Sequence, residues 1–219
     1  MAVSGADGAV DVGEGSGVES PGRLAALSDG IYAIAMTLLV LDVSVPDGLS
    51  RAGFEHEMHQ VWPKLGAYAL SFAVLAALWR DQRQILDQVR RADTLVVRLT
   101  LAGLGAVALL PFPTALLSEY GGAEPEAVAV YAATIALISL LHLALFLTLW
   151  RRPRLQARPV PDHIGWTTAI ELGAVVVICA ASVVLAFAVS PRAGLVTWLL
   201  SIPLKHVVRW GGRVYHRVR

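Results

Sequence analysis

The chain has 219 residues, of which 56% are hydrophobic and only 16% are charged, and its formal net charge at pH 7 is +1. A soluble domain of this size carries about 25% charged residues, and the apolar residues here fall into long blocks, which excludes a soluble globular protein. The single cysteine, Cys179, rules out an internal disulfide and a cysteine metal cluster. We therefore expect an all-α, polytopic integral membrane protein.

Residues 1–21 are predicted to form a disordered cytoplasmic tail. The first 20 residues are rich in Gly, Ser, Ala and Val and contain four acidic residues but no Lys or Arg. They lack the basic region and the cleavage site of a signal peptide, and this composition is typical of disorder.

Six apolar segments are long enough to cross a membrane as helices, a crossing that takes about 20 residues. They comprise residues 24–45, 61–80, 95–117, 127–150, 166–189 and 194–210. Pro111 and Pro113 should kink or end the third helix near the outer face, because proline interrupts helical hydrogen bonding. These segments predict a six-helix transmembrane domain over residues 22–210 and a basic cytoplasmic tail over residues 211–219.

Basic residues are concentrated after alternate spans. Arginines follow the second, fourth and sixth spans, whereas the loops between them are mainly acidic. The arginines are Arg80, Arg83, Arg90 and Arg91, then Arg151, Arg152, Arg154 and Arg158, then Arg209, Arg213, Arg217 and Arg219. Because basic loops stay in the cytoplasm, both termini are predicted to be cytoplasmic, which agrees with an even number of spans.

The first span carries an acidic residue, Asp29, about a turn and a half inside the membrane. An isolated carboxylate there costs roughly 3 kcal/mol or more, so a partner is required. Arg23 is six residues away and points in the opposite direction, so it cannot pair with Asp29 within one helix. The partner must come from another span or from another subunit.

Three further ionisable residues, Arg98, His142 and Glu171, lie in different spans but at a level similar to that of Asp29. Counting about 1.5 Å per residue places all four roughly 5–12 Å from the cytoplasmic end. We favour an intramembrane polar network that holds the helices together, and a proton or ion relay is the alternative.

A helical projection of the first span, at about 100° per residue, separates two faces. One stripe contains Leu27, Gly30, Ile31, Ile34, Thr37, Leu38, Leu41 and Val45. The opposite face carries Asp29, Tyr32, Met36 and Leu39. Ile34, Thr37 and Leu41 form a ridge along the stripe. Taken alone, an apolar stripe with a threonine bonded back to its own helix is ordinary in membrane helices.

The segment from Arg23 to Gly30, RLAALSDG, resembles the first span of the transmembrane protein 175 potassium-channel family, whose hallmark is Arg-x-x-x-Phe-Ser-Asp. The six-span length resembles the bacterial members of that family, which assemble as homotetramers. Leu27 stands where the family usually has phenylalanine. Gln82 and Arg83 stand where it usually has histidines after the tryptophan, so any polar network that uses those histidines must differ in this chain.

The resemblance implies a potassium-permeable homotetramer in the bacterial plasma membrane, with four copies of the first span around a central pore. Ile34, Thr37 and Leu41 match the constriction, and Leu27 and Leu38 are expected to line the pore secondarily. The signature residues are expected to buttress the pore helix through inter-helix hydrogen bonds; they are Arg23, Ser28 and Asp29. No TVGYG-like filter occurs, so selectivity should come from a narrow apolar gate and a ring of threonine hydroxyls.

Two other classes of function compete with a channel. A proton-coupled secondary transporter would use Glu171 and His142 as proton carriers and the prolines of the third span as a helix interruption, although no internal repeat relates residues 21–110 to 111–219. A membrane enzyme is disfavoured because no catalytic motif is present and residues 56–59 do not have zinc-motif spacing. We expect no cofactor, no resident metal and no nucleic-acid partner; the basic C-terminus should contact membrane lipid.

Overall fold

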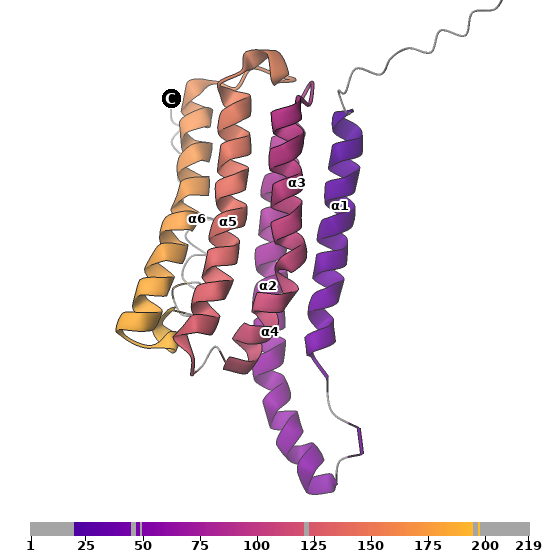
Figure 1. The fold of residues 1–219 in the computed structure, drawn as a ribbon, viewed down its shortest axis with the longest axis vertical. Coiled ribbons are helices and arrows are strands. Elements are labelled where there is room, and N and C mark those ends of the chain that lie inside the picture. Colours follow the sequence, from indigo (N-terminus) through magenta and orange to yellow (C-terminus); the bar gives the residue numbers. More distant parts are fainter. Residues whose placement is uncertain (1–19, 45–46, 49, 121–122, 195–196, 198–219) are drawn as a thin grey trace, which may run out of the picture.

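The computed structural model describes residues 20–44, 47–48, 50–120, 123–194 and 197. These residues form a bundle of long helices, and no β-strand occurs among them (Figure 1). Five helical stretches within this part of the chain are long and apolar enough to span a membrane. They are Pro21–Asp42, Arg51–Leu86, Thr94–Tyr120, Pro125–Trp150 and Asp162–Ala188. The predicted all-α fold is therefore confirmed for the described residues, and five of the predicted spans correspond to helices that could cross a membrane.

The first span consists of α1 (Pro21–Leu38) and a short 3₁₀ helix, η1 (Leu39–Asp42). Pro21 occupies the first turn, where its missing N–H removes no helical hydrogen bond. The span ends at Asp42, whereas the sequence predicted residue 45. Gly48 then turns the chain with a φ of 76°, a backbone conformation that glycine adopts without strain.

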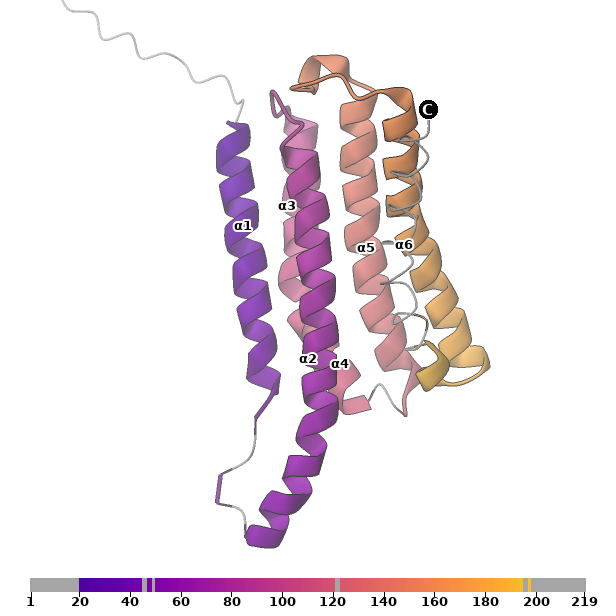
Figure 2. The same cartoon turned by 180° about the vertical axis from the view of Figure 1, so that it is seen from behind.

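Helix α2 (Arg51–Leu86) is much longer than the predicted span 61–80. It begins where the Ser50 hydroxyl accepts a hydrogen bond from the Gly53 N–H at 3.2 Å, which is the usual role of a serine N-cap. Its first turns project beyond the end of the bundle (Figures 1 and 2).

The third span is divided into α3 (Thr94–Leu109) and α4 (Pro111–Tyr120). Asp93 caps the start of α3 by accepting a hydrogen bond from the Val96 N–H at 2.9 Å. The break at Leu110 confirms the interruption that Pro111 and Pro113 predicted, because a proline has no N–H to continue the helical pattern.

Helices α5 (Pro125–Trp150) and α6 (Asp162–Ala188) form a closely packed pair joined through a second 3₁₀ helix, η2 (Pro153–Leu155). The predicted sixth span, residues 194–210, lies outside the described residues except for residues 194 and 197. The C-terminal tail 211–219 lies wholly outside them, as does the N-terminal tail through residue 19.

Two loops at one end of the bundle are fastened to each other. The Arg90 N–H donates to the Leu155 carbonyl and the Ala157 N–H donates to the Gln88 carbonyl, both at 2.7 Å. The Arg152 guanidinium contacts the Asp93 carboxylate at 2.8 Å. We call this set of contacts the loop clasp; it joins the α2–α3 connection to the α5–α6 connection.

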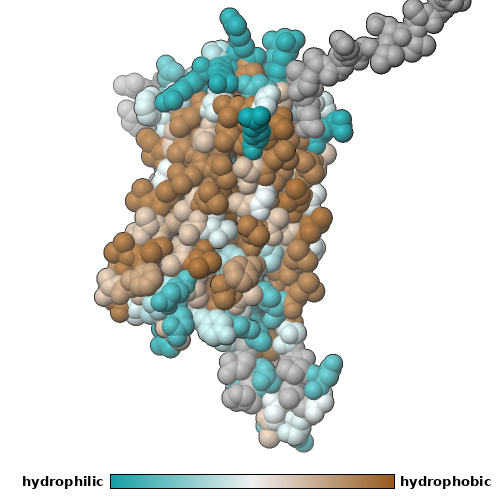
Figure 3. Space-filling model, in the orientation of Figure 1, coloured by the Kyte–Doolittle hydropathy of each residue, from teal (hydrophilic) through white to brown (hydrophobic). Residues whose placement is uncertain are grey.

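The surface is divided along the long axis of the bundle. An apolar band lies between polar ends (Figure 3). The start of α1 and the two arginine-rich loops lie at the same end (Figure 1), which is the arrangement that the alternating charge pattern requires. The assignment of this arginine-rich end to the cytoplasm stays a prediction.

The interior contains two groups of buried apolar residues. One lies toward the η1 end and includes Tyr32, Leu39 and Tyr131. The other lies toward the arginine-rich end and includes Leu24, Phe146 and Leu149. Both groups draw on α1, so the inner face of α1 is anchored along its length.

Candidate functional site

One face of α1 and η1 is open along its length. The ridge residues Ile34 and Leu41 have exposed fractions of 60% and 69%, and the secondary positions Leu27 and Leu38 have 45% and 40%. Thr37 is exposed on the same face. The opposite face is buried through Leu24, Ser28, Tyr32, Ala35 and Leu39. Since α1 stands at one edge of the bundle (Figures 1 and 2), the stripe faces away from the rest of the chain.

The 3₁₀ turn changes the direction of Leu41 relative to a straight α-helix. A 3₁₀ helix turns about 120° per residue rather than about 100°. Over the three residues from Leu39 to Leu41 the added rotation is about 60°, which brings Leu41 in line with Leu38. Leu41 therefore remains on the exposed stripe, although the sequence projection assumed a continuous α-helix.

The Thr37 hydroxyl donates to the Ile34 carbonyl of its own helix at 2.8 Å. A hydroxyl has one hydrogen to donate and two lone pairs that accept. Because the hydrogen is used inside the helix, the oxygen presents lone pairs to the exposed face. This bond is common in membrane helices, and it leaves the hydroxyl oxygen as an acceptor that a cation can contact.

Asp29 is held by two side chains of α2. The Trp79 indole N–H donates to Asp29 Oδ1 at 2.8 Å, and the Arg83 guanidinium contacts Oδ2 at 2.7 Å. Arg83 also reaches Asp87 at 3.3 Å. This confirms that the partner of Asp29 comes from another span. Trp79 and Arg83 were not predicted as its partners, although their spacing of four residues puts both on one face of α2.

The other two signature residues have different surroundings. Arg23 is exposed. Ser28 is buried, and its hydroxyl has no hydrogen-bond partner among the described residues. Within this part of a single chain, Asp29 alone of the three makes the inter-helix bonds that the resemblance implied.

The buried side of α1 also carries a polar contact. The Tyr32 hydroxyl lies 3.4 Å from Nε2 of His142, and both residues are buried. His142 belongs to α5, so this contact ties α1 to α5. Tyr32 was placed on the inner face by the projection but was not predicted as a functional residue.

The other two members of the predicted polar network lie in separate surroundings. Arg98 is exposed on α3. Glu171 is half-buried beside a small cavity of about 70 Å³ that Asp81 and Gln88 also line. A single network of Arg98, His142 and Glu171 stays a prediction.

A further polar cluster was missed from the sequence. The Ser71 hydroxyl lies 3.0 Å from the Tyr131 hydroxyl and 3.1 Å from that of Thr114. The Thr114 hydroxyl also donates to the Leu110 carbonyl at 3.0 Å, which accepts from the Thr114 N–H at 3.1 Å as well. All three side chains are buried, so the cluster joins α2, α4 and α5 at the helix interruption.

Comparison with known proteins places these residues in a family context. The family model described as "Endosomal/lysosomal potassium channel TMEM175" matches residues 23–111. This range contains the exposed stripe of α1 and the contacts of Trp79 and Arg83 with Asp29, which we call the clamp on Asp29. A protein named as a potassium channel in Streptomyces collinus is 40% identical over 129 residues, which cover 59% of this chain and 62% of that protein. The alignment thus spans less than two thirds of the Streptomyces relative.

A second relative, named as a potassium channel in Chamaesiphon minutus, is 37% identical over 157 residues. The alignment covers 67% of this chain and 76% of that protein. The crystal structure of a lysosomal potassium-selective channel TMEM175 homologue from Chamaesiphon minutus superposes with a TM-score of 0.72 at 28% identity. The superposition covers 83% of this chain and 94% of the chain in that crystal structure. The likeness therefore extends over most of the fold.

Proposed function

This chain belongs to the TMEM175 family, and from that premise we propose that it forms a potassium-permeable channel through which cations move passively. The relatives are named as potassium channels, and the family is one of ion channels rather than enzymes. We extend that activity to this chain because the segment that matches the family model, residues 23–111, includes the exposed stripe of α1.

The observation that carries the proposal is the coincidence of two independent features. The positions that match the family constriction, Ile34, Thr37 and Leu41, are among those that the fold of a single chain leaves uncovered, and they lie on one face of the first span. One helix cannot enclose a conduit, so the pore requires several copies of α1 around a common axis. We propose a homotetramer, the assembly implied for bacterial members, in the plasma membrane with both termini in the cytoplasm.

Conduction then depends on how an ion passes the ridge. Ile34 and Leu41 offer no ligands, so a cation must shed water there or wait for the constriction to widen and wet. K⁺ holds its hydration shell less tightly than Na⁺ and loses less on dehydration. Thr37 hydroxyl oxygens, whose lone pairs face the stripe, replace part of the lost water. The expected result is a modest preference for K⁺.

The clamp on Asp29 joins α1 to α2 on the side of α1 that faces the rest of the chain. It fixes the first half of α1, which lies toward the arginine-rich end of the bundle, against α2 through a hydrogen bond from Trp79 and an ion pair with Arg83. The Tyr32–His142 contact adds a second attachment deeper in the bundle. We propose that these contacts set the angle at which α1 presents its stripe to the pore.

A proton-coupled transporter is the second candidate. The helix break at Leu110 and the cavity beside Glu171 and Asp81 are the features that favour it, because interrupted helices and intramembrane carboxylates are typical of transporters. The two functions differ in their flux: a transporter saturates with substrate and follows a proton gradient, whereas channel current reverses at the ion's equilibrium potential.

The test is reconstitution of the full chain in liposomes with K⁺, Na⁺ or Cs⁺ gradients, in which the wild type is compared with Leu41→Asn and Ile34→Asn. Each substitution should wet the constriction and raise K⁺ flux. Leu137→Asn is the matched control, because Leu137 is an exposed apolar residue on α5, with an exposed fraction of 51%. Unchanged flux in both ridge variants would remove these residues from the pore.

A further inference from the structure

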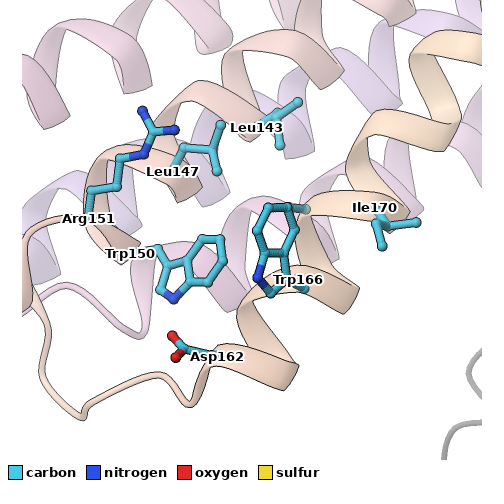
Figure 4. Close-up of a pocket in the computed structure, with 8 residues that line it drawn as sticks. Leu143, Leu147, Trp150, Arg151, Asp162, Trp166 and Ile170 are labelled. Carbon is cyan, nitrogen blue, oxygen red and sulfur yellow. The ribbon is translucent and has the colours of Figure 1, made fainter.

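A groove opens between α5 and α6 at the arginine-rich end of the bundle (Figure 4). Its volume is about 540 Å³. Leu143 and Leu147 of α5 and Ile170 of α6 form apolar walls. Ile170 has an exposed fraction of 65%, so the groove is open to the surroundings along the α6 side.

Two indoles form the polar end of this groove, and their position is fixed by the backbone. Trp150 and Trp166 meet edge to face, with ring centroids 5.4 Å apart and an interplanar angle of 84°. Gly165 is buried, and a Cβ atom at this position would clash with the Trp150 ring. The ring therefore lies directly against the α6 backbone, and the shape of the groove is built into the fold.

The surroundings of the groove indicate what it can bind. Tryptophan side chains favour the boundary between the apolar band and the headgroups. The connection that borders the groove, residues 151–162, contains four arginines and one acidic residue, Asp162. Arg151 and Asp162 both line the groove (Figure 4). The lining itself therefore holds one positive and one negative side chain, and the excess positive charge comes from the other arginines of the connection. Basic residues beside a pocket between membrane helices suit an anionic lipid headgroup.

We propose that the groove binds an anionic phospholipid of the phosphatidylglycerol type. One acyl chain lies against Leu143, Leu147 and Ile170. The phosphate contacts the guanidinium of Arg151, which suits phosphate geometry through paired N–H donors. Hydroxyl groups of the glycerol headgroup donate to the Asp162 carboxylate, which a headgroup without hydroxyl donors cannot satisfy.

The position of the groove agrees with a lipid occupant. Helix α6 stands at the edge of the bundle opposite α1 (Figures 1 and 2). If α1 faces the axis of the assembly, the α5–α6 edge faces the bilayer. The proposal itself stands on the groove and is tested by binding, so it does not depend on ion conduction.

The experiment uses the full-length protein in vesicles and measures quenching of its tryptophan fluorescence by lipids with brominated acyl chains. Phosphatidylglycerol and phosphatidylcholine with the same chains are compared. The wild type should prefer phosphatidylglycerol. Arg151→Gln should reduce that preference about tenfold, as expected for the loss of a hydrogen bond between charged groups. Arg154→Gln, which removes the same charge from the same connection, should have a much smaller effect.

A second pair of variants tests the groove without altering charge. Ala169→Phe places a bulky ring among the lining residues and should reduce quenching by both lipids, whereas Ala133→Phe, at an exposed position toward the other end of α5, should not. Equal losses in Arg151→Gln and Arg154→Gln would show diffuse attraction to the connection and overturn the proposal. Unchanged quenching in Ala169→Phe would also overturn it, and would point to a second chain or the segment beyond residue 197 as the occupant.

Discussion

Removing the positive charge of Arg83 is expected to loosen α1 from α2, because this side chain and Trp79 hold Asp29 from α2. Arg83→Gln leaves a carboxylate at the edge of the apolar band with one indole donor. Asp29→Asn removes the opposite charge and leaves an amide that still accepts from Trp79. If the two charged groups act on each other, the double variant loses less than the sum of the single losses.

The size of the effect follows from the geometry of the pair. The charged atoms are 2.7 Å apart, but each side chain has an exposed fraction of 42%. At a charge separation of about 4 Å, the attraction lies between about 1 kcal/mol in water and about 4 kcal/mol at an effective dielectric constant near 20. Screening at the exposed side favours the lower part of this range, so we expect a coupling of about 1–2 kcal/mol. For a domain of this size, that corresponds to roughly 2–8 °C in melting temperature.

The assay is thermal unfolding of the wild type, both single variants and the double variant in one detergent at one scan rate. Asp87→Asn is the control, since it removes the other carboxylate on Arg83, an exposed partner one turn away, and should cost no more than about 0.5 kcal/mol. Additive losses in the double variant would refute the reasoning, because they would mean that the Asp29–Arg83 contact contributes no net stability.

Three further outcomes are expected. Thr37→Ala should lower K⁺ over Na⁺ discrimination in liposome flux more than it lowers expression, because the oxygen on the open stripe is lost; Thr37→Ser should retain the discrimination. Gly165→Ala should destabilise the protein by about 1–3 kcal/mol in thermal unfolding, because the indole over this position must move. Gly173→Ala, on the same helix with open space around it, should be neutral or stabilising. Tyr32→Phe should lower stability by about 1 kcal/mol, since it removes the hydroxyl near His142, and an unchanged melting temperature would show that this contact contributes nothing.

Hydropathy was enough to locate the helices that could cross a membrane, since a span must contain an apolar segment as long as the bilayer core is thick. It did not find where a helix ends outside the membrane. Helix α2 begins at Arg51 because Ser50 caps it, and the polar residues that follow favour a helix without being apolar. The interruption at Leu110 was predictable because proline acts through its own covalent structure.

Side-chain partners were much harder to predict than helices. Asp29 was expected to have a partner, because the cost of an isolated charge follows from the residue and its depth. The identity of that partner depends on the rotation and height of α2 relative to α1, which no pattern within one helix encodes. The spacing of Trp79 and Arg83 was a usable signal, but it becomes informative only when α2 is known to face Asp29. The stripe could be located from the sequence because its residues share one face of a single helix, but that this face stays uncovered was implied by the family resemblance and not by the projection.

The loop clasp has a mechanical consequence. The hydrogen bonds between the α2–α3 and α5–α6 connections, with the Arg152–Asp93 pair, hold the two hairpins together at the arginine-rich end. A relative tilt of the hairpins that leaves the loop clasp intact therefore turns about this end, its displacement grows with distance from the clasp, and it must also deform the Ser71–Thr114–Tyr131 cluster. Helix α5 has 26 residues and a length of about 39 Å, so a tilt of about 3° would move its far end by roughly 2 Å. At that far end α5 contacts α4, and α4 contacts η1, the 3₁₀ helix that contains Leu41. A small tilt would therefore produce its largest displacement beside the ridge.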